Sequence, residues 1–266
     1  MTSQLYKALT IAGSDTSGGA GIQADLKAFQ ACGVYGMTAL TTIVAQDPHN
    51  NWFHAVYPLP LETIKAQLET VLSGIGPDAV KTGMLPTAEI IQLIAETIEA
   101  KKIERLVVDP VMVCKGVDEP VNPEAAQSLR QYLVPKALVV TPNLFEAAQL
   151  SGRPPIQSIE DMKEAAKHIH DLGAKYVVIK GGKLEPEPAI DLFYDGETFH
   201  ILENERITPP HTHGAGCTFA AVITAELAKG KAVLDAVQEA KKRVSAAIKA
   251  GFPLNQYVGS VNHLAL

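Results

Sequence analysis

One short stretch near the C-terminus combines residue types that suit anion chemistry. Residues 211–217 read His-Thr-His-Gly-Ala-Gly-Cys, after two prolines and before a long apolar helical pattern. A helix that opens on small residues leaves its first backbone N–H groups free to hold an anion, and glycine lets a ligand come close. The thiol of Cys217 falls in the first turn, where the helix field favours the thiolate. The stretch predicts an anion site beside a reactive thiol, unless it is only a glycine turn that packs a helix over a buried cysteine.

Polar residues also follow the predicted strands. Because ligands of open parallel sheets bind outside the carboxyl ends of the strands, we expect these residues at one edge. Asp109 and Glu146 place two carboxylates there, which suit Mg²⁺ beside a phosphate, and Lys180 and Lys183 add cations. With the anion site, this set predicts phosphoryl transfer, which depends on positioning, a metal and electrostatic stabilisation. The strand-end residues are Gly13, Asp15, Gln46, Gly83, Met84, Asp109, Asn143, Glu146, Lys180 and Gly182.

Each of these residues also has a purely structural interpretation. Asp109 precedes Pro110 and can simply end a strand. Asn143 and Glu146 have the spacing of a capping box at a helix start. Lys180 can be a solvated side chain. The coincidence of all of them at one sheet edge favours a site over the separate explanations.

The elements that must position these residues alternate along the chain. Short apolar runs separated by helical patterns predict parallel βαβ units, with both faces of the sheet covered and right-handed crossovers. After Gly181 the pattern changes to an antiparallel hairpin, with strands at 190–194 and 198–202. The polar and aromatic segment 49–60 is expected to be an edge flap or lid. The sequence predicts one α/β domain over residues 1–266, with parallel strands at 8–13, 38–45, 79–82, 105–109, 137–140 and 176–180.

The first predicted strand leads into a glycine-rich loop. Residues 14–21 read Ser-Asp-Thr-Ser-Gly-Gly-Ala-Gly and connect the strand to a helix, as in the opening unit of nucleotide-binding folds. The loop has neither the Gly-x-Gly-x-x-Gly spacing nor the Gly-Lys-Ser/Thr ending of a Walker loop. It offers backbone donors but no lysine for phosphates. A small polar molecule therefore suits it better than a dinucleotide.

The composition excludes several classes of partner. The chain has 266 residues, 47% of them hydrophobic, and a net charge of −6, which argues against a nucleic acid or an anionic membrane surface. Cys32, Cys114 and Cys217 have no Cys-x-x-Cys spacing and predict neither a disulfide framework nor a zinc site. No apolar leader or bilayer-long stretch is recognised. We expect a cytoplasmic protein without a membrane partner.

Five motifs in order also carry a resemblance to a known family. Residues 12–27 read Ala-Gly-Ser-Asp-Thr-Ser-Gly-Gly-Ala-Gly-Ile-Gln-Ala-Asp-Leu-Lys and resemble the N-terminal signature of hydroxymethylpyrimidine (phosphate) kinases. The resemblance covers nearly the whole chain and points to the ribokinase-like superfamily, in the branch shared with pyridoxal kinases. The remaining motifs are Thr82-Gly83-Met84-Leu85, Asp109-Pro110-Val111-Met112, Thr141-Pro142-Asn143-Leu144-Phe145-Glu146-Ala147 and His213-Gly214-Ala215-Gly216-Cys217-Thr218.

The resemblance implies a fold, a reaction and a homodimer. The fold would be a ribokinase-like three-layer α/β/α sandwich, with a mostly parallel central sheet and a small β-hairpin or lid. The reaction would be ATP-dependent, Mg²⁺-assisted phosphorylation of a hydroxymethyl group on a heteroaromatic ring. Many ribokinase-like enzymes use an aspartate as base, and Cys217 stands in that position here, as in the pyrimidine kinases. Those kinases have Gly-Thr-Gly-Cys where residues 214–217 read Gly-Ala-Gly-Cys, a change that keeps the backbone donors.

The implied roles surround the transferring phosphoryl group. The anion hole would be formed by Gly214, Ala215 and Gly216, with Cys217 as base for the substrate hydroxyl. The ring pocket would be lined by Gly13, Asp15, Ala20, Gln46, Met84, Val111 and Cys114. ATP would be contacted by Asn143, Glu146, Lys180, Lys183, Thr212 and His213, and Mg²⁺ would be held by Asp109 and Glu146. Residues 110–120 and 211–213 would act as lids that exclude water.

Cys114 is the residue expected to discriminate between substrates. Its place is typically alanine in dedicated pyrimidine kinases, and it resembles the second cysteine of a two-cysteine class of pyridoxal kinases. A thiol there could add to the aldehyde of pyridoxal as a hemithioacetal, although a small buried hydrophobe is the plain alternative. Gln46 instead matches the pyrimidine kinases and could pair with an aminopyrimidine edge.

These features lead to three functional hypotheses. We expect a kinase that converts pyridoxal to pyridoxal 5′-phosphate, with hydroxymethylpyrimidine as a second substrate. A dedicated hydroxymethylpyrimidine/phosphomethylpyrimidine kinase of thiamine biosynthesis is the alternative. A non-catalytic module that senses vitamin precursors belongs to a different class, and such a module would need neither the thiol at the anion site nor the carboxylate pair.

Overall fold

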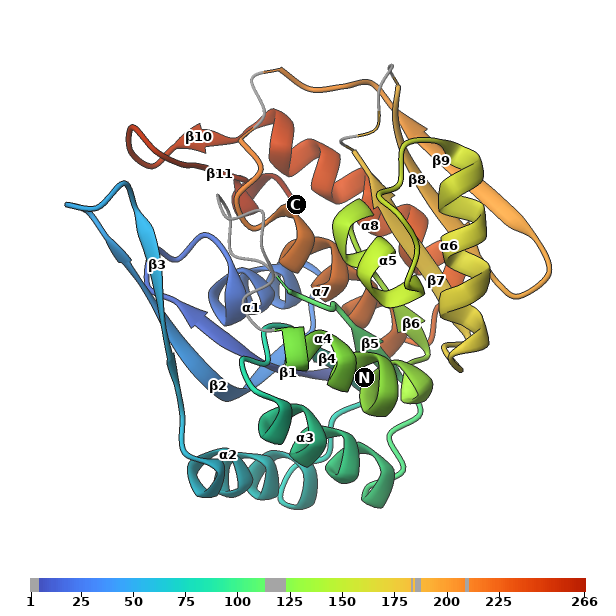
Figure 1. Ribbon diagram of the computed structural model, residues 1–266. Coiled ribbons are helices and arrows are strands. Elements are labelled where there is room, and N and C mark those ends of the chain that lie inside the picture. The colour runs from blue at the N-terminus through green and yellow to red at the C-terminus, as the bar shows by residue number, and fades with distance from the viewer. Residues whose placement is uncertain (1–4, 113–122, 183, 185–187, 209–210) are drawn as a thin grey trace.

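A nine-stranded sheet lies between two layers of helices in the computed structural model, which describes residues 5–112, 123–182, 184, 188–208 and 211–266 (Figure 1). The strands are β1 (Lys7–Asp15), β2 (Tyr35–Asp47), β3 (Phe53–Pro58), β4 (Ala79–Thr82), β5 (Leu106–Val108), β6 (Val139–Val140), β7 (Tyr176–Gly181), β8 (Ala189–Tyr194), β9 (Phe199–Asn204), β10 (Phe252–Pro253) and β11 (Gly259–Ser260). The helices are α1 (Gly21–Ala31), α2 (Leu61–Leu68), α3 (Ala88–Ala100), α4 (Pro123–Ser128), α5 (Leu144–Ser151), α6 (Ile159–Asp171), α7 (Ala215–Ala228) and α8 (Val233–Lys249).

The large sheet is parallel at its centre and antiparallel at both edges. Its strand order is β3-β2-β1-β4-β5-β6-β7-β8-β9, and the strands from β2 to β7 in this order are parallel. The predicted hairpin is confirmed as β8 and β9, which extend the sheet at one edge. The predicted edge flap is confirmed at the other edge, where β3 pairs with β2. The small ribbon of β10 and β11 was not predicted.

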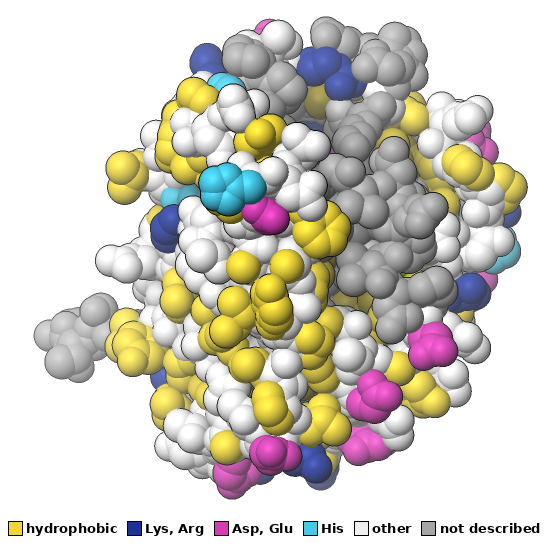
Figure 2. Space-filling model, turned by 60° about the vertical axis from the view of Figure 1, so that its left-hand side comes forward, with side chains coloured by type: hydrophobic (Ala, Val, Ile, Leu, Met, Phe, Trp, Pro, Cys, Tyr) yellow, Lys and Arg dark blue, Asp and Glu magenta, His cyan; other side chains and the backbone are white. Residues whose placement is uncertain are grey.

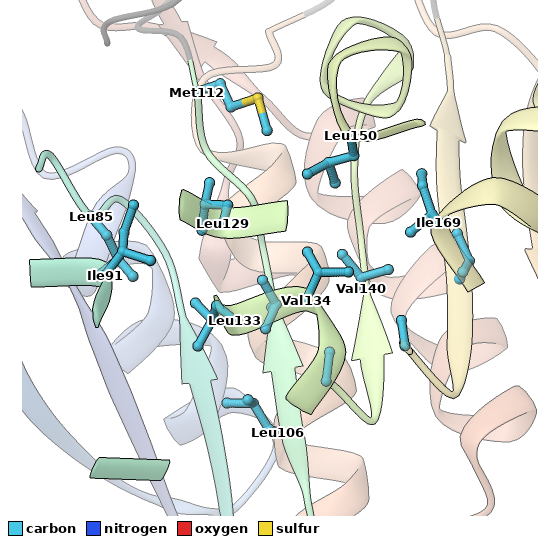
Figure 3. Packing of buried hydrophobic residues seen from close by; sticks show 14 of the residues in the cluster. Leu85, Ile91, Leu106, Met112, Leu129, Leu133, Val134, Val140, Leu150 and Ile169 are labelled. Carbon is cyan, nitrogen blue, oxygen red and sulfur yellow. The ribbon is translucent and has the colours of Figure 1, made fainter. Parts of the chain in front are cut away.

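Strand side chains alternate between two apolar cores, one on each side of the sheet. One core packs against α2 to α6, and the other packs against α1, α7 and α8. In β4, Ala79 belongs to the core under α7 and Val80 to the opposite core, as the period of two in a strand requires. Figure 3 shows the core on the side of α3 to α6, with Leu133, Val134 and Val140 packed beside one another. The predicted three-layer α/β/α arrangement is confirmed.

The same alternation decides which polar residues face α7. Lys81 stands two residues after Ala79 in β4 and therefore points to the α7 side. Asp109 and Lys180 stand two residues after members of the same core in β5 and β7. Three charged side chains thus lie on one face of the sheet, near its carboxyl edge.

Helix α7 is buried along most of its length. Residues 218–228 are buried, and the helix packs against α1, α8 and strands β1, β4 and β5. It has 14 residues, and no helix in the described part of the chain is long and apolar enough to cross a membrane. Because its body is enclosed, its N-terminus is fixed against the carboxyl edge of the sheet.

Local hydrogen bonds set the starts of several helices. The hydroxyl of Thr87 accepts from the backbone N–H of Ile90 at the start of α3. Helix α5 begins with the capping box predicted from Asn143 and Glu146, and at the start of α6 the hydroxyl of Ser158 accepts from the N–H of Asp161. Such signals act within one turn, which is why the sequence reveals them.

Candidate active site

A small cavity lies at the carboxyl ends of β1, β2 and β4, beside the first turn of α7. Its volume is about 160 Å³, which suits one small ring and not a dinucleotide. Cys217 and His213 line it on the side of α7. Cys114, which we predicted in the ring pocket, lies outside the described residues. The other six residues predicted for that pocket all line the cavity: Gly13, Asp15, Ala20, Gln46, Met84 and Val111.

Asp15 organises the polar wall of this cavity. Its Oδ1 accepts a hydrogen bond from Nε2 of Gln46 at 2.7 Å, and its Oδ2 accepts from the backbone N–H of Ala20 at 2.7 Å. Nε2 of His213 lies 2.8 Å from the same Oδ2, and Ser17 donates its hydroxyl to the carboxylate. Burial by itself would raise the pKa of Asp15, but His213 and the other donors hold this pKa well below its usual range. The carboxylate therefore stays ionised, and the amide carbonyl of Gln46 is left to face a ligand.

The position of His213 corrects its predicted role. We expected His213 to contact ATP, but its ring lies in the small cavity against Asp15. The cause is its backbone: the N–H of His213 donates to Gly259, and its carbonyl accepts from Val261, so the β11 segment fixes this residue. Its neighbour Thr212 is exposed, and an ATP contact for it stays a prediction.

The first turn of α7 is where the sequence predicts an anion site. Gly214 has φ +84°, and a Cβ atom there would collide with the carbonyl oxygen of Gly19, so the position requires glycine. The N–H of Ala215 donates to the carbonyl of Thr212 at 3.0 Å. The N–H of Ala215 is thus used inside the turn, and a part for Ala215 in the anion hole stays a prediction. The first-turn N–H groups of Gly216 and Cys217, which have no acceptor within the helix, remain beside that of Gly214.

A charged pair lies over the same turn. Nζ of Lys180 is 2.9 Å from Oδ1 of Asp109, and a Cβ atom built on Gly216 would lie 3.2 Å from this Nζ. Thr141 donates its hydroxyl to the same Asp109 oxygen at 3.3 Å. Burial opposes the charge of Lys180, yet the carboxylates of Asp109 and Glu146 raise the pKa of this lysine. Lys180 is thus a cation held beside the first turn of α7.

Asn143 and Glu146 hold a structural role and also adjoin this pair. Oδ1 of Asn143 accepts from the N–H of Glu146 at 2.9 Å, and Oε2 of Glu146 accepts from the N–H of Asn143 at 2.8 Å. Burial raises the pKa of Glu146 to about 7, with Lys180 acting against this rise and Asp109 adding to it. The capping interpretation is therefore confirmed, and it leaves the side-chain amide N–H₂ of Asn143 available to a ligand.

The carboxylates fit a metal that arrives with a nucleotide. Among the residues that the structure describes, no group of three or more His, Cys, Asp or Glu side chains is placed to hold a metal ion. Mg²⁺ commonly takes one or two carboxylates and completes its shell with water and phosphate oxygens. Asp109 and Glu146 match that donor set and not a dedicated metal centre. Lys183, predicted near them, lies outside the described residues.

The protonation state of Cys217 corrects a prediction made from the helix field. We expected the first turn of α7 to favour the thiolate. Burial instead raises the pKa of Cys217 to about 12. The carboxylates of Asp25 and Asp109 add to this rise, and the ammonium of Lys81 acts against it. Desolvation therefore outweighs the helix N-terminus and favours the thiol form of Cys217, although the side chain is only half-buried at the cavity wall.

The site also contains a buried ion pair that was not predicted from the sequence. Nζ of Lys81 is 2.8 Å from Oδ2 of Asp25, and neither side chain has solvent-exposed surface. Lys81 lines the small cavity together with Cys217. A charged residue within the apolar run 79–82 was the available signal, because a strand buried on both faces has no other place for it.

Comparison with known proteins matches these features to a family. A family model described as phosphomethylpyrimidine kinase matches residues 15–262. The chain belongs to the phosphomethylpyrimidine kinase family. The match begins at Asp15, which lines the small cavity, and ends at Asn262. The resemblance carried by the five motifs is therefore confirmed.

Relatives within and around the phosphomethylpyrimidine kinase family cover nearly the full chain. The chain is 62% identical over 263 residues to a pyridoxine kinase of Bacillus subtilis (strain 168), which is 98% of this chain and 97% of the relative. It is 42% identical over 262 residues to a hydroxymethylpyrimidine/phosphomethylpyrimidine kinase of the same organism, with 98% and 96% covered. The pyridoxal kinase of Staphylococcus aureus, solved with AMP-PCP and pyridoxal, is 54% identical with a TM-score of 0.93, covering 98% of this chain and 94% of that one. The ribokinase-like fold is confirmed.

Proposed function

We propose that this protein is an ATP-dependent kinase that phosphorylates the 5′-hydroxymethyl group of pyridoxal and also accepts hydroxymethylpyrimidine. The proposal depends on the first turn of α7, which lies between the ring-sized cavity and the Lys180–Asp109 pair. A phosphoryl group held there is in reach of a hydroxyl on one side and a nucleotide on the other. The S. aureus relative, solved with a nucleotide analogue and pyridoxal, supports the same pair of ligands.

The chemical step assigns one task to each group. In the fraction of molecules whose Cys217 is ionised, the substrate hydroxyl gives its proton to this thiolate, and its oxygen forms a bond to the γ-phosphorus of ATP. The bond from that phosphorus to the bridging oxygen breaks, and its electron pair leaves with ADP. Backbone donors at Gly214 and Gly216 stabilise the charge on the transferring oxygens, and Lys180 stabilises charge on the nucleotide side.

The proposed metal ligands are Asp109 and Glu146, with water between the carboxylates and the ion. Bound with the nucleotide, Mg²⁺ would neutralise phosphate charge. Asn143 and Lys180 are proposed to contact the phosphates, with Lys183 and Thr212 as further nucleotide contacts. These roles rest on the chemistry of the donors and on their common position at the carboxyl edge of the sheet.

Substrate choice is proposed to rest on Gln46 and Cys114. Asp15 holds the amide N–H₂ of Gln46, so the carbonyl oxygen of Gln46 is offered to a donor on the ring. Both the phenol of pyridoxal and the amine of hydroxymethylpyrimidine provide such a donor. Cys114 would add to the aldehyde, which pyridoxal alone possesses.

A dedicated hydroxymethylpyrimidine/phosphomethylpyrimidine kinase is the second candidate. The observation in its favour is Gln46 in the ring cavity, together with the 42% identical B. subtilis relative of that name. A coupled assay of ADP release with pyridoxal, pyridoxine and hydroxymethylpyrimidine separates the candidates. We expect turnover with pyridoxal to exceed turnover with the pyrimidine. Turnover confined to the pyrimidine would favour the second candidate, and no turnover with any of the three would refute a kinase.

A homodimer is also proposed. Exposed apolar side chains gather on the side of the molecule that carries β2 and β3, as Figure 2 shows. The patch adjoins an edge strand, where unpaired backbone groups invite a second chain. Its members include Tyr35, Ile43, Phe53, Tyr57 and Leu61.

Residues 1–266 are further proposed to form one kinase domain. Two apolar cores join the helices to the two faces of one sheet, which supports this proposal. A cytoplasmic location and a place in thiamine biosynthesis stay predictions.

A further inference from the structure

The buried pair of Lys81 and Asp25 lies outside the roles assigned above. Oδ2 of Asp25 accepts from Nζ of Lys81 at 2.8 Å and from the hydroxyl of Thr10 at 2.6 Å. Oδ1 of Asp25 is buried without a hydrogen-bond partner among the described residues. Two fully buried charges and a carboxylate oxygen without a hydrogen bond lower the stability of the folded protein. An apolar pair of similar volume would serve packing as well, so the charge itself calls for an explanation.

The register of the sheet aims this pair at Cys217. Lys81 is paired with Thr10 on β1 and with Val107 on β5, so it points to the face covered by α1 and α7. A Cβ atom built on Gly83 would lie 3.2 Å from Nζ of Lys81, which places the ammonium under the cavity floor. Lys81 and Cys217 both line this cavity.

Four charged side chains face Cys217 from the elements packed around it. Lys81 comes from β4, Asp25 from α1, Asp109 from the end of β5 and Lys180 from β7. The backbone N–H of Gly21 also points to the thiol. Lys180 is partly exposed and pairs with Asp109 on the nucleotide side, where phosphates compete for it. Lys81 has no exposed surface and no access to the nucleotide side, so its charge is available to Cys217 throughout turnover.

We propose that Lys81 is a positioning residue for the reaction: its ammonium, oriented by Asp25 and Thr10, is the fixed positive charge that stabilises the Cys217 thiolate. The substrate hydroxyl then gives its proton to this thiolate as the oxygen–phosphorus bond forms. The inference rests on the proposed function for its catalytic consequence alone. The charge relation between Lys81 and Cys217 can be tested without any substrate.

The test is the alkylation rate of Cys217 by iodoacetamide at pH 8, with the modified cysteine located by peptide mass spectrometry. Burial raises the pKa of Cys217, so the thiolate is a minor species at this pH and the rate follows its fraction. Lys81→Met should slow alkylation by about tenfold or more, because a rise of about one unit in the pKa of Cys217 lowers the thiolate fraction tenfold. Asp25→Asn should accelerate it, because this change removes a negative charge and keeps the ammonium.

Opposite signs for the two variants distinguish an electrostatic role from a packing role, which would change both rates in the same direction. Glu226→Gln is the matched control, since Glu226 is also fully buried, pairs with Lys229 and lies at the far end of α7. It should leave the rate unchanged. If Lys81→Met does not fold, Lys81→Met/Asp25→Asn replaces it and should react more slowly than Asp25→Asn. Equal rates in that comparison, or slower alkylation in Asp25→Asn than in wild type, would overturn the proposal.

Kinase assays then connect the pair to turnover. In Lys81→Met, kcat should fall and its rise with pH should move to higher pH, while KM for ATP stays near the wild-type value. Alkylation shifts in a protein without kinase activity would refute the proposed function and leave the charge relation standing. Normal turnover in Lys81→Met, with an unchanged alkylation rate, would refute the charge relation between Lys81 and Cys217 and leave the proposed function standing.

Discussion

Lys180 and Asp109 form an ion pair of 2.9 Å that joins the end of β7 to the end of β5 above the first turn of α7. The two residues were predicted separately, one for phosphate and one for Mg²⁺. Their pairing couples these roles, because a phosphate that takes the ammonium frees the carboxylate for a cation. The pairing also offsets the desolvation cost of the buried carboxylate of Asp109 and the partly buried ammonium of Lys180.

Replacing Lys180 should therefore lower kcat in addition to weakening nucleotide binding. Lys180→Met is expected to lower kcat by about 10²- to 10³-fold, as for loss of one preorganised electrostatic contact. Steady-state kinetics with varied ATP and Mg²⁺ check this. Lys167→Met is the control, because Lys167 forms an exposed pair with Glu164. A Lys180→Met enzyme with wild-type kcat would contradict the proposed role.

Glu146 predicts a pH dependence of stability in the absence of Mg²⁺. Its pKa is raised from 4.5 to about 7, so the folded protein binds a proton that the unfolded chain has lost. The free energy of unfolding should thus fall by about 1–3 kcal/mol from this group as pH rises from 4.5 to 7. Urea unfolding in EDTA across this range measures the effect. Glu146→Gln keeps an acceptor for the capping box and should remove this part of the slope; an unchanged slope would show that other groups cause it.

Substitutions of Cys217 and Cys114 should have different effects on the two substrates. Cys217→Ala is expected to lower turnover of pyridoxal and of hydroxymethylpyrimidine alike, by about 10²- to 10⁴-fold, as for loss of a general base. Cys114→Ala is expected to lower turnover of pyridoxal and spare the pyrimidine, which has no aldehyde. Parallel assays with both substrates provide the measurement. An equal loss for both substrates in Cys114→Ala would argue against a hemithioacetal.

Gly214 should tolerate no side chain. Gly214→Ala adds a strained positive φ and a collision with the carbonyl of Gly19, so it should displace the anion site and abolish activity. Gly230→Ala is the matched control, because Gly230 has φ +85° but open space around it. The control should lose about 1 kcal/mol of stability from backbone strain and keep its activity. Thermal unfolding and turnover of both variants test this, and similar activity in the two would contradict it.

The apolar patch on β2 and β3 predicts the oligomeric state. Tyr57→Glu places a charge in a patch residue that is 58% exposed, and it should convert a dimer into a monomer. Light scattering after size-exclusion chromatography measures the mass. Ile201→Glu on β9, at the opposite edge strand, is the control and should leave the dimer intact. A wild-type protein that is monomeric at micromolar concentration would refute the proposal.

Local signals explain why so much of the fold could be predicted. Short apolar runs between helical patterns located the parallel strands, and the capping spacing of Asn143 and Glu146 located the start of α5. The strand-end rule then placed Asp15, Gln46 and Met84 at one cavity. These features depend on neighbours within a few residues or on the general order of strands, so one sequence is enough.

The remaining features depend on contacts between distant parts of the chain. His213 meets Asp15 across 198 positions, and Lys81 meets Asp25 across 56, so no local pattern could place either contact. The protonation state of Cys217 likewise depends on how much of the fold surrounds it. The sequence by itself determined the strands of the large sheet, several helix starts and the residue types at the carboxyl edge, because capping hydrogen bonds and apolar runs depend on residues that are neighbours in the chain. Tertiary structure decided the partner of each charge and the state of the thiol, because desolvation depends on segments that only folding brings together.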